Sequence, residues 1–175
     1  MKKAAESTRR ASRGGSGVEI TSEGGPFSDV SSRVLKARAE KMLGLLGLPG
    51  AEVSIALVDD KAMKGLHARF MNDPSTTDVL SFPLHHAPRE VVAKDRRAAL
   101  GDIAICVPQA RRQARARKAT PVDEATALLA HGILHLLGFD HRTKDEEREM
   151  FALGRVLEVA GLNKRPIKAR LEVIS

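Results

Sequence analysis

Three histidines in the C-terminal half of the chain have the spacing of a metal site. They are His131, His135 and His141. On a helix, the first two lie one turn apart on the same face, and their imidazoles can bind one ion at about 2.1 Å each. Gly138 is expected to end that helix, so that the chain turns back and brings His141 to the same ion.

The chemistry that this spacing indicates is hydrolysis. Three histidines leave one position of a tetrahedral Zn²⁺ open for water, which is typical of catalytic zinc sites. The bound ion lowers the pKa of that water towards about 7. Unrelated core or surface histidines are the alternative, but half of the six histidines fall in this one segment. We therefore expect one Zn²⁺, or another divalent transition metal, at His131, His135 and His141.

The residue after the first histidine limits which bond can be hydrolysed. The order of histidines and glycine follows the H-E-x-x-H-x-x-G-x-x-H pattern of metzincin peptidases, in which the glutamate is the general base. Here that position is Gly132, which argues against peptide hydrolysis. The nearest carboxylate is Asp140. It either acts in catalysis, by orienting a ligand or taking a proton, or belongs only to the turn after Gly138.

The segment from His131 to His141 resembles the H-G-x-L-H-L-x-G-[YF]-D-H signature of the YbeY endoribonucleases, also called rRNA maturation factors. Thr77-Asp-Val-Leu-Ser-Phe-Pro83 resembles that family's T-D-V-L-S-F-P, and Leu100-Gly-Asp-Ile-Ala-Ile-Cys106 its L-G-D-I-x-I-C. The resemblance covers about residues 50–160. It implies a small mixed sheet flanked by helices, and the three histidines as metal ligands.

The activity implied by this resemblance is that of a single-strand-specific, metal-dependent endoribonuclease. It would act in ribosomal RNA maturation and ribosome quality control, with ribosomal RNA and ribosomal subunits as partners. Two alternatives stay open. One is a metal-containing ribosome assembly factor without catalytic activity, and the other, less favoured because of Gly132, is a zinc metallopeptidase.

One family residue is absent from its expected position. Family members commonly have an arginine just after an aromatic residue, in the helix before the T-D-V-L-S-F strand. Here Met71 follows Phe70 at that point, and Arg69 is the candidate catalytic residue in its place. A shift of two residues turns a helical side chain by roughly 200°. Arg69 can therefore substitute only if the helix ends or bends there.

The charge of the chain favours an anionic partner. It has 29 Lys and Arg against 22 Asp and Glu, a net charge of +7. A helix expected over about residues 108–118 carries Arg111, Arg115 and Lys118 on one face. That row can follow an RNA backbone and give a salt-dependent affinity. A solvated helix face is the alternative.

Hydrophobic patterning predicts the elements that position these residues. Strands are expected over residues 52–58, 78–82 and 101–106, and Val18-Glu-Ile20 can begin another. Helices are expected from about residue 32 to 46, 60 to 71, 108 to 118, 121 to 137 and 144 to 160, with a polar loop over 85–99. The expected fold class is α/β (α+β), with a small mixed sheet of about four strands flanked by helices. The metal site lies on the penultimate helix and the following turn.

Composition divides the chain into three parts. Residues 1–26 read as a disordered basic arm, although Val18-Glu-Ile20 can begin a strand. Residues 27–162 are expected to form one domain, which the resemblance identifies as a metal-dependent endoribonuclease domain, and residues 163–175 a basic tail. The single cysteine, Cys106, has no internal disulfide partner and fits a reducing compartment. Neither a secretory signal nor a membrane-spanning stretch is visible, so we expect a cytoplasmic protein without a membrane partner.

Overall fold

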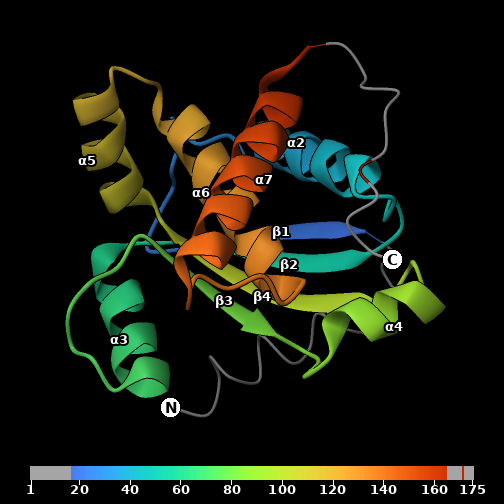
Figure 1. The fold of residues 1–175 in the computed structure, drawn as a ribbon. Helices are drawn as coiled ribbons and strands as arrows, with labels where there is room; N and C mark the ends of the chain where they lie inside the picture. The colour runs from blue at the N-terminus through green and yellow to red at the C-terminus, as the bar shows by residue number, and fades with distance from the viewer. Residues whose placement is uncertain (1–16, 165–170, 172–175) are drawn as a thin grey trace.

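The structure, a computed structural model, describes residues 17–164 and residue 171. Within these residues one sheet is formed by four strands, β1 (Val18–Glu23), β2 (Glu52–Val58), β3 (Val79–Pro83) and β4 (Ala99–Cys106) (Figure 1). The strand order is β1-β2-β4-β3. β1 and β4 both run parallel to β2, whereas β3 is antiparallel to β4. The expected mixed sheet is confirmed.

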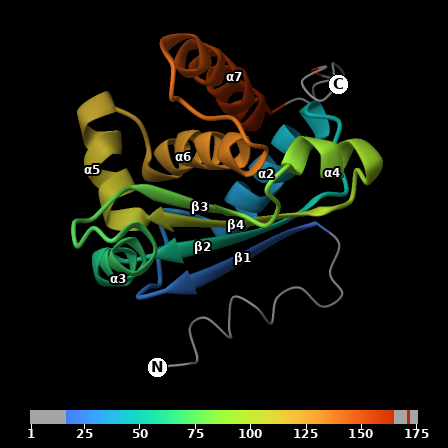
Figure 2. The same cartoon turned by 60° about the horizontal axis from the view of Figure 1, so that its bottom comes forward.

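The helices of the described chain are α2 (Ser32–Leu45), α3 (Asp60–Met71), α4 (Pro88–Lys94), α5 (Val107–Arg117), α6 (Pro121–Leu136) and α7 (Lys144–Leu162). α2, α4, α6 and α7 lie on one side of the sheet, and α5 stands beside α6 (Figure 2). Among residues 17–164 and 171, no helix combines the length and hydrophobicity that crossing a membrane requires.

Alternating strand residues supply a separate apolar cluster to each face of the sheet. Ile55 and Ile103 belong to the larger cluster, which also contains Leu129 of α6. The smaller cluster lies on the opposite face, where α3 packs. It consists of Val58, Met63, Leu80, Ala104 and Cys106. The larger cluster therefore fixes α6, which carries two of the three candidate histidines, against the sheet.

Side-chain caps set the helix boundaries that the sequence indicates. The Ser31 hydroxyl accepts a hydrogen bond from the Val34 N–H at 3.4 Å, and α2 begins there. The Thr120 side chain caps α6, whose first residue is a proline. Thr143 and Glu146 form a reciprocal capping box at the start of α7. Capping motifs are local, which is why the sequence predicts these starts well.

Two expectations differ from the structure. The segment expected as a loop over residues 85–99 contains α4, whose buried Pro88 and Val92 are four residues apart. Two buried residues one helical turn apart do not make a hydrophobic periodicity long enough to predict a helix in a polar segment. Residues 18–23 form β1 rather than part of the N-terminal arm, because Val18 is buried at the sheet. The rest of the arm, residues 1–16, and most of the tail lie outside the described residues.

Candidate active site

Helix α6 brings His131 and His135 together. They lie one turn apart, and both rings are partly exposed at the edge of a helix whose other residues are mostly buried. The two Nε2 atoms are 3.0 Å apart and the ring centroids 4.5 Å apart. Both nitrogens thus point at a shared position, as the four-residue spacing predicts.

The turn after α6 brings the third histidine to the same place. Gly138 has a φ of +79°, the left-handed conformation that ends the helix. The ring centroid of His141 then lies 5.4 Å from that of His135 and 6.2 Å from that of His131. The three side chains that the spacing predicts to converge therefore do converge.

The donor set suits a transition metal, although the complete ligand geometry is not formed. In the described part of the chain, no group of three or more His, Cys, Asp or Glu side chains has the arrangement needed to hold an ion. His141 Nδ1 faces Asp140 Oδ1 at 3.1 Å. The chemistry of the set still fits, since three imidazole nitrogens are ligands that Zn²⁺ prefers.

Burial keeps two of these imidazoles neutral. It lowers the pKa of His131, and the neighbouring His135 lowers it further. Burial also lowers the pKa of His135, with a further contribution from His141. A neutral imidazole has a free lone pair, whereas a protonated one has none. The pocket around α6 therefore holds both rings in the form that binds a cation.

Asp140 holds the third ring in place. Its Oδ1 accepts a hydrogen bond from the His141 backbone N–H at 2.9 Å, and its Oδ2 accepts one from Arg142 Nε at 2.6 Å. These two bonds lower the pKa of Asp140, which stays anionic. A carboxylate on Nδ1 fixes the tautomer of a histidine and leaves Nε2 with the lone pair. These contacts favour an orienting role for Asp140.

Residues of α4 pack against the turn that follows α6. The Arg89 guanidinium lies 4.0 Å from the centroid of the Phe139 ring, and Arg89 Nε donates to the Leu137 carbonyl oxygen at 3.3 Å. Pro88 lies next to Gly138, where an added Cβ would be 3.1 Å from its ring. The sequence offered no signal for this support, because the segment resembles a polar loop.

Gly132 lets α6 approach the sheet closely. A Cβ at this position would lie 3.0 Å from two carbons of Ile103 and 3.2 Å from Ser81 Oγ. The side chain at position 132 thus points at the sheet and away from solvent. A glutamate here would have no room and no partner, so the structure agrees with the argument against a peptidase.

A cavity of about 490 Å³ opens beside His131, between the start of β3, α5 and α6. Its polar lining consists of Asp78, Gln113, Arg117, Glu124 and His131, and its apolar lining of Val79, Ala116, Ala127 and Leu128. Sequence patterning leaves Asp78 as either a partner of a ligand imidazole or a cap of the neighbouring turn, and it gives no role to Gln113 or Arg117. These two residues are four apart on α5 and so share a face. That spacing was the available signal.

Arg69 lies in the last turn of α3, 5.3 Å from the Phe70 ring centroid. α3 ends two residues later, and Asn72 follows in the left-handed conformation with a φ of +55°. The helix end that a substitution by Arg69 requires is therefore present. No contact among the described residues joins Arg69 to the histidines.

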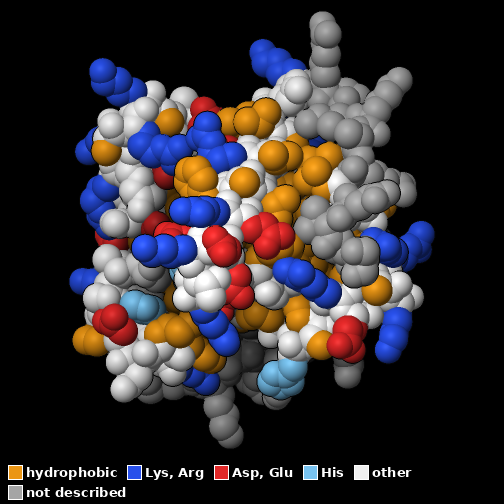
Figure 3. All heavy atoms as spheres, in the orientation of Figure 1, with side chains coloured by type: hydrophobic (Ala, Val, Ile, Leu, Met, Phe, Trp, Pro, Cys, Tyr) orange, Lys and Arg blue, Asp and Glu red, His pale blue; other side chains and the backbone are white. Residues whose placement is uncertain are grey.

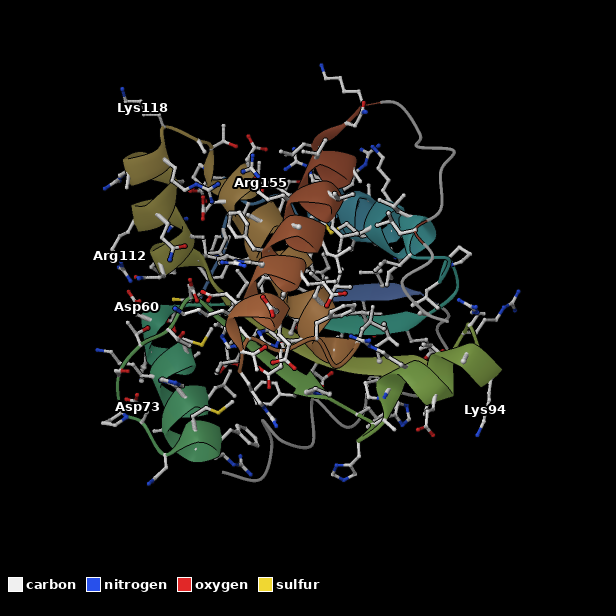
Figure 4. All side chains as sticks on the ribbon, viewed as in Figure 1. Asp60, Asp73, Lys94, Arg112, Lys118 and Arg155 are labelled. Atoms are coloured by element: carbon white, nitrogen blue, oxygen red, sulfur yellow. The ribbon has the colours of Figure 1, made fainter. Side chains whose placement is uncertain are left out.

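The predicted basic row on α5 is divided. Arg111 forms an ion pair with Asp29, with its Nη2 2.6 Å from Asp29 Oδ1. Arg115 and Lys118 are exposed and form no ion pair with a described residue. Lys118 stands at the end of α5, whereas Arg112 points back towards Asp60 of α3 (Figure 4). Figure 3 shows Lys and Arg side chains over α5 and the neighbouring helices.

A four-stranded mixed sheet with three imidazoles gathered at the end of one helix defines a small α/β enzyme of the hydrolase class. The sequence model of the family "Endoribonuclease YbeY" matches residues 23–158, and the chain belongs to that family. The endoribonuclease YbeY of Acidothermus cellulolyticus is 42% identical over 159 residues, covering 87% of this chain and 96% of that protein.

Further relatives support the same family. The endoribonuclease YbeY of Mycobacterium ulcerans is 43% identical over 146 residues, which cover 81% of each chain. That of Thermobifida fusca is 41% identical over 137 residues, covering 78% of this chain and 88% of the relative. The solution structure of TM1509 from Thermotoga maritima superposes with a TM-score of 0.59 at 26% identity, covering 82% and 88% of the two chains. The expected family and fold class are confirmed.

Proposed function

We propose that this member of the endoribonuclease family hydrolyses single-stranded RNA with the help of one Zn²⁺ at His131, His135 and His141. The observation that carries this proposal is the convergence of the three imidazoles, two of which burial keeps neutral. Ribosomal RNA within ribosomal subunits is the proposed substrate, and maturation and quality control are the proposed roles. The proposed location is the cytoplasm.

The residues around the site have distinct tasks in this proposal. A bound Zn²⁺ supplies Lewis acidity towards a phosphodiester oxygen and lowers the pKa of a water molecule. Asp140 is a positioning residue, because its carboxylate fixes the tautomer of His141. Arg69 is a candidate for contact with the RNA phosphate, since it lies at the exposed end of α3.

Arg115 and Lys118 are proposed to contact the RNA backbone. Both are exposed without an ion-pair partner in the described chain, so each can release a counterion on binding. Arg111 contributes less to this row than its spacing suggests, because Asp29 already neutralises it. Replacing Arg115 and Lys118 by alanine should weaken RNA binding uniformly across sequences and reduce the salt dependence by about two phosphate contacts.

The decisive experiment measures bound zinc and the cleavage of single-stranded RNA side by side. We expect His131→Ala and His135→Ala to lose both, because each removes a ligand. His86→Ala is the matched control, since His86 is exposed and distant in sequence from the cluster. Full cleavage by both ligand variants would refute the proposal and indicate a contaminating nuclease.

Two parallel measurements separate the alternatives. A peptide substrate tests for metallopeptidase activity, which we expect to be absent because position 132 has no room for a glutamate base. Ribosome association is measured with the same pure protein. Association without any RNA cleavage by the wild type would favour an assembly factor whose metal is structural.

A further inference from the structure

The cavity beside His131 has features that the hydrolysis of a phosphodiester does not use. At about 490 Å³ it is large enough for one nucleobase and its ribose, whereas the phosphate belongs at the histidines. Four of its lining residues are apolar, namely Val79, Ala116, Ala127 and Leu128. An apolar wall has nothing to offer a phosphate, but it suits the flat face of a base.

Arg117 provides a fixed planar group at the rim of this cavity. Its Nη1 donates to both carboxylate oxygens of Glu124 at 3.1 Å, and the Glu124 side chain is only 5% exposed. Its Nη2 lies 3.9 Å from Glu158 Oε1, which is within ion-pair range but beyond hydrogen-bonding distance. The Glu124 carboxylate therefore anchors the guanidinium, while about half of the Arg117 side chain remains exposed. Guanidinium planes stack on unpaired bases in RNA recognition.

Gln113 adds polar capacity that the protein leaves unused. Its Nε2 donates to Asp78 Oδ2 at 2.8 Å, so the amide is held in one orientation. Its Oε1 is enclosed and has no hydrogen-bond partner in the described structure. An enclosed acceptor without a donor is costly. An N–H group on the edge of a bound base would supply the missing donor.

We propose that this cavity receives one unstacked nucleobase, from the nucleotide next to the phosphate at the histidines. This inference rests on the proposed function, because it assumes that RNA reaches His131. It also gives a physical reason for the preference for single strands, since a base paired in a duplex cannot leave its stack to enter the cavity. The apolar part of the lining contacts the face of a base, which predicts little discrimination among the four bases.

The chain has few aromatic side chains on which RNA bases could stack. Proteins that bind single strands commonly stack bases on aromatic side chains, yet this chain has five Phe and neither Trp nor Tyr. Phe70 and Phe82 stack on each other edge to face, with centroids 4.9 Å apart. A cavity lined by an anchored guanidinium can supply base contact without an aromatic platform.

The test measures binding by the full-length protein with its metal removed by a chelator, so that it does not depend on cleavage. The probe is a fluorescein-labelled oligouridylate of about six nucleotides, followed by fluorescence anisotropy. Ala127→Phe and Ala116→Phe fill the cavity from two different helices. Ala37→Phe, at an exposed position of α2, is the matched control. Urea unfolding of all three variants checks that they are folded.

We expect each filling variant to bind the probe about tenfold more weakly, the loss that follows when one base contact is removed. The control should bind like the wild type. A second set of probes lacks one base each, at successive positions. The wild type should bind one of these probes about tenfold more weakly than the complete probe, whereas Ala127→Phe should bind that probe and the complete probe equally.

Unchanged binding by both folded filling variants would overturn the inference, as would equal affinity for the duplex form of the probe. These outcomes leave the hydrolysis proposal standing, because they are obtained without metal. Conversely, cleavage that survives His131→Ala and His135→Ala would refute hydrolysis at this site even if the cavity binds a base.

Discussion

Gly132 and Gly65 offer a paired test of how closely α6 packs on the sheet. Both glycines lie inside helices, so replacing either by alanine stabilises the helix itself by about 1 kcal/mol. At Gly65 of α3, nothing lies within 4 Å of the added Cβ. We therefore expect Gly65→Ala to increase the free energy of unfolding by about 1 kcal/mol.

Gly132→Ala should have the opposite effect. The added Cβ would lie 3.0 Å from Ile103 Cδ1 and Cγ2, and Ile103 is buried in the core. Forcing one extra methyl group into a packed core costs about 1–3 kcal/mol. After the helix term of about 1 kcal/mol is subtracted, the net loss is about 0–2 kcal/mol. The helix term cancels between the two variants, so they should differ by about 1–3 kcal/mol.

The measurement is equilibrium unfolding in urea, followed by far-ultraviolet circular dichroism on metal-free protein. In thermal unfolding, the same difference corresponds to roughly 2–4 °C per kcal/mol for a chain of this size. Equal stabilisation by both substitutions would refute the packing argument. In that case the sheet would have room at position 132, and the steric case against a glutamate base would fail.

Three further outcomes are expected from the same unfolding assay. Burial lowers the pKa of His131 and His135 below 6.5, so the folded state binds fewer protons than the unfolded one. The free energy of unfolding of the metal-free protein is then highest above about pH 6.5 and falls as the pH drops through the folded pKa values. A free energy of unfolding that does not change between about pH 7 and 5 would contradict this prediction. Arg117→Ala leaves the buried Glu124 carboxylate without its main partner and should lower the free energy of unfolding by about 1–3 kcal/mol. A change within about 0.5 kcal/mol, the usual range for a surface substitution, would show that water replaces the guanidinium. Thr143→Ala removes one half of the capping box of α7 and should lower the free energy of unfolding by about 1 kcal/mol. An unchanged urea midpoint would contradict this prediction.

The parts of the site that the sequence predicted are those set by local geometry. The four-residue spacing of His131 and His135 and the left-handed turn at Gly138 follow from helix geometry and from glycine's backbone freedom. The starts of α6 and α7 follow from Thr120 and Thr143, because caps are made by neighbours in the chain. None of these features needs knowledge of the tertiary fold.

The parts that the sequence missed depend on contacts between distant segments. Arg111 seemed available to RNA, but its partner Asp29 is 82 residues earlier in the chain. Gln113 and Arg117 looked like members of a basic surface helix until the packing of α5 beside α6 turned them towards the cavity. No periodicity within α5 could show which of its faces meets α6.

The support that α4 gives to the turn after α6 has a thermodynamic consequence. His141 is the one histidine of the cluster that is not on the helix, and a free turn would have to be immobilised each time a ligand binds. Arg89 on Phe139 and Pro88 beside Gly138 order that turn in advance. The turn therefore loses its conformational entropy during folding and not during ligand binding. Positions 88 and 89 can accordingly set the affinity of the histidine cluster, although neither residue is in it.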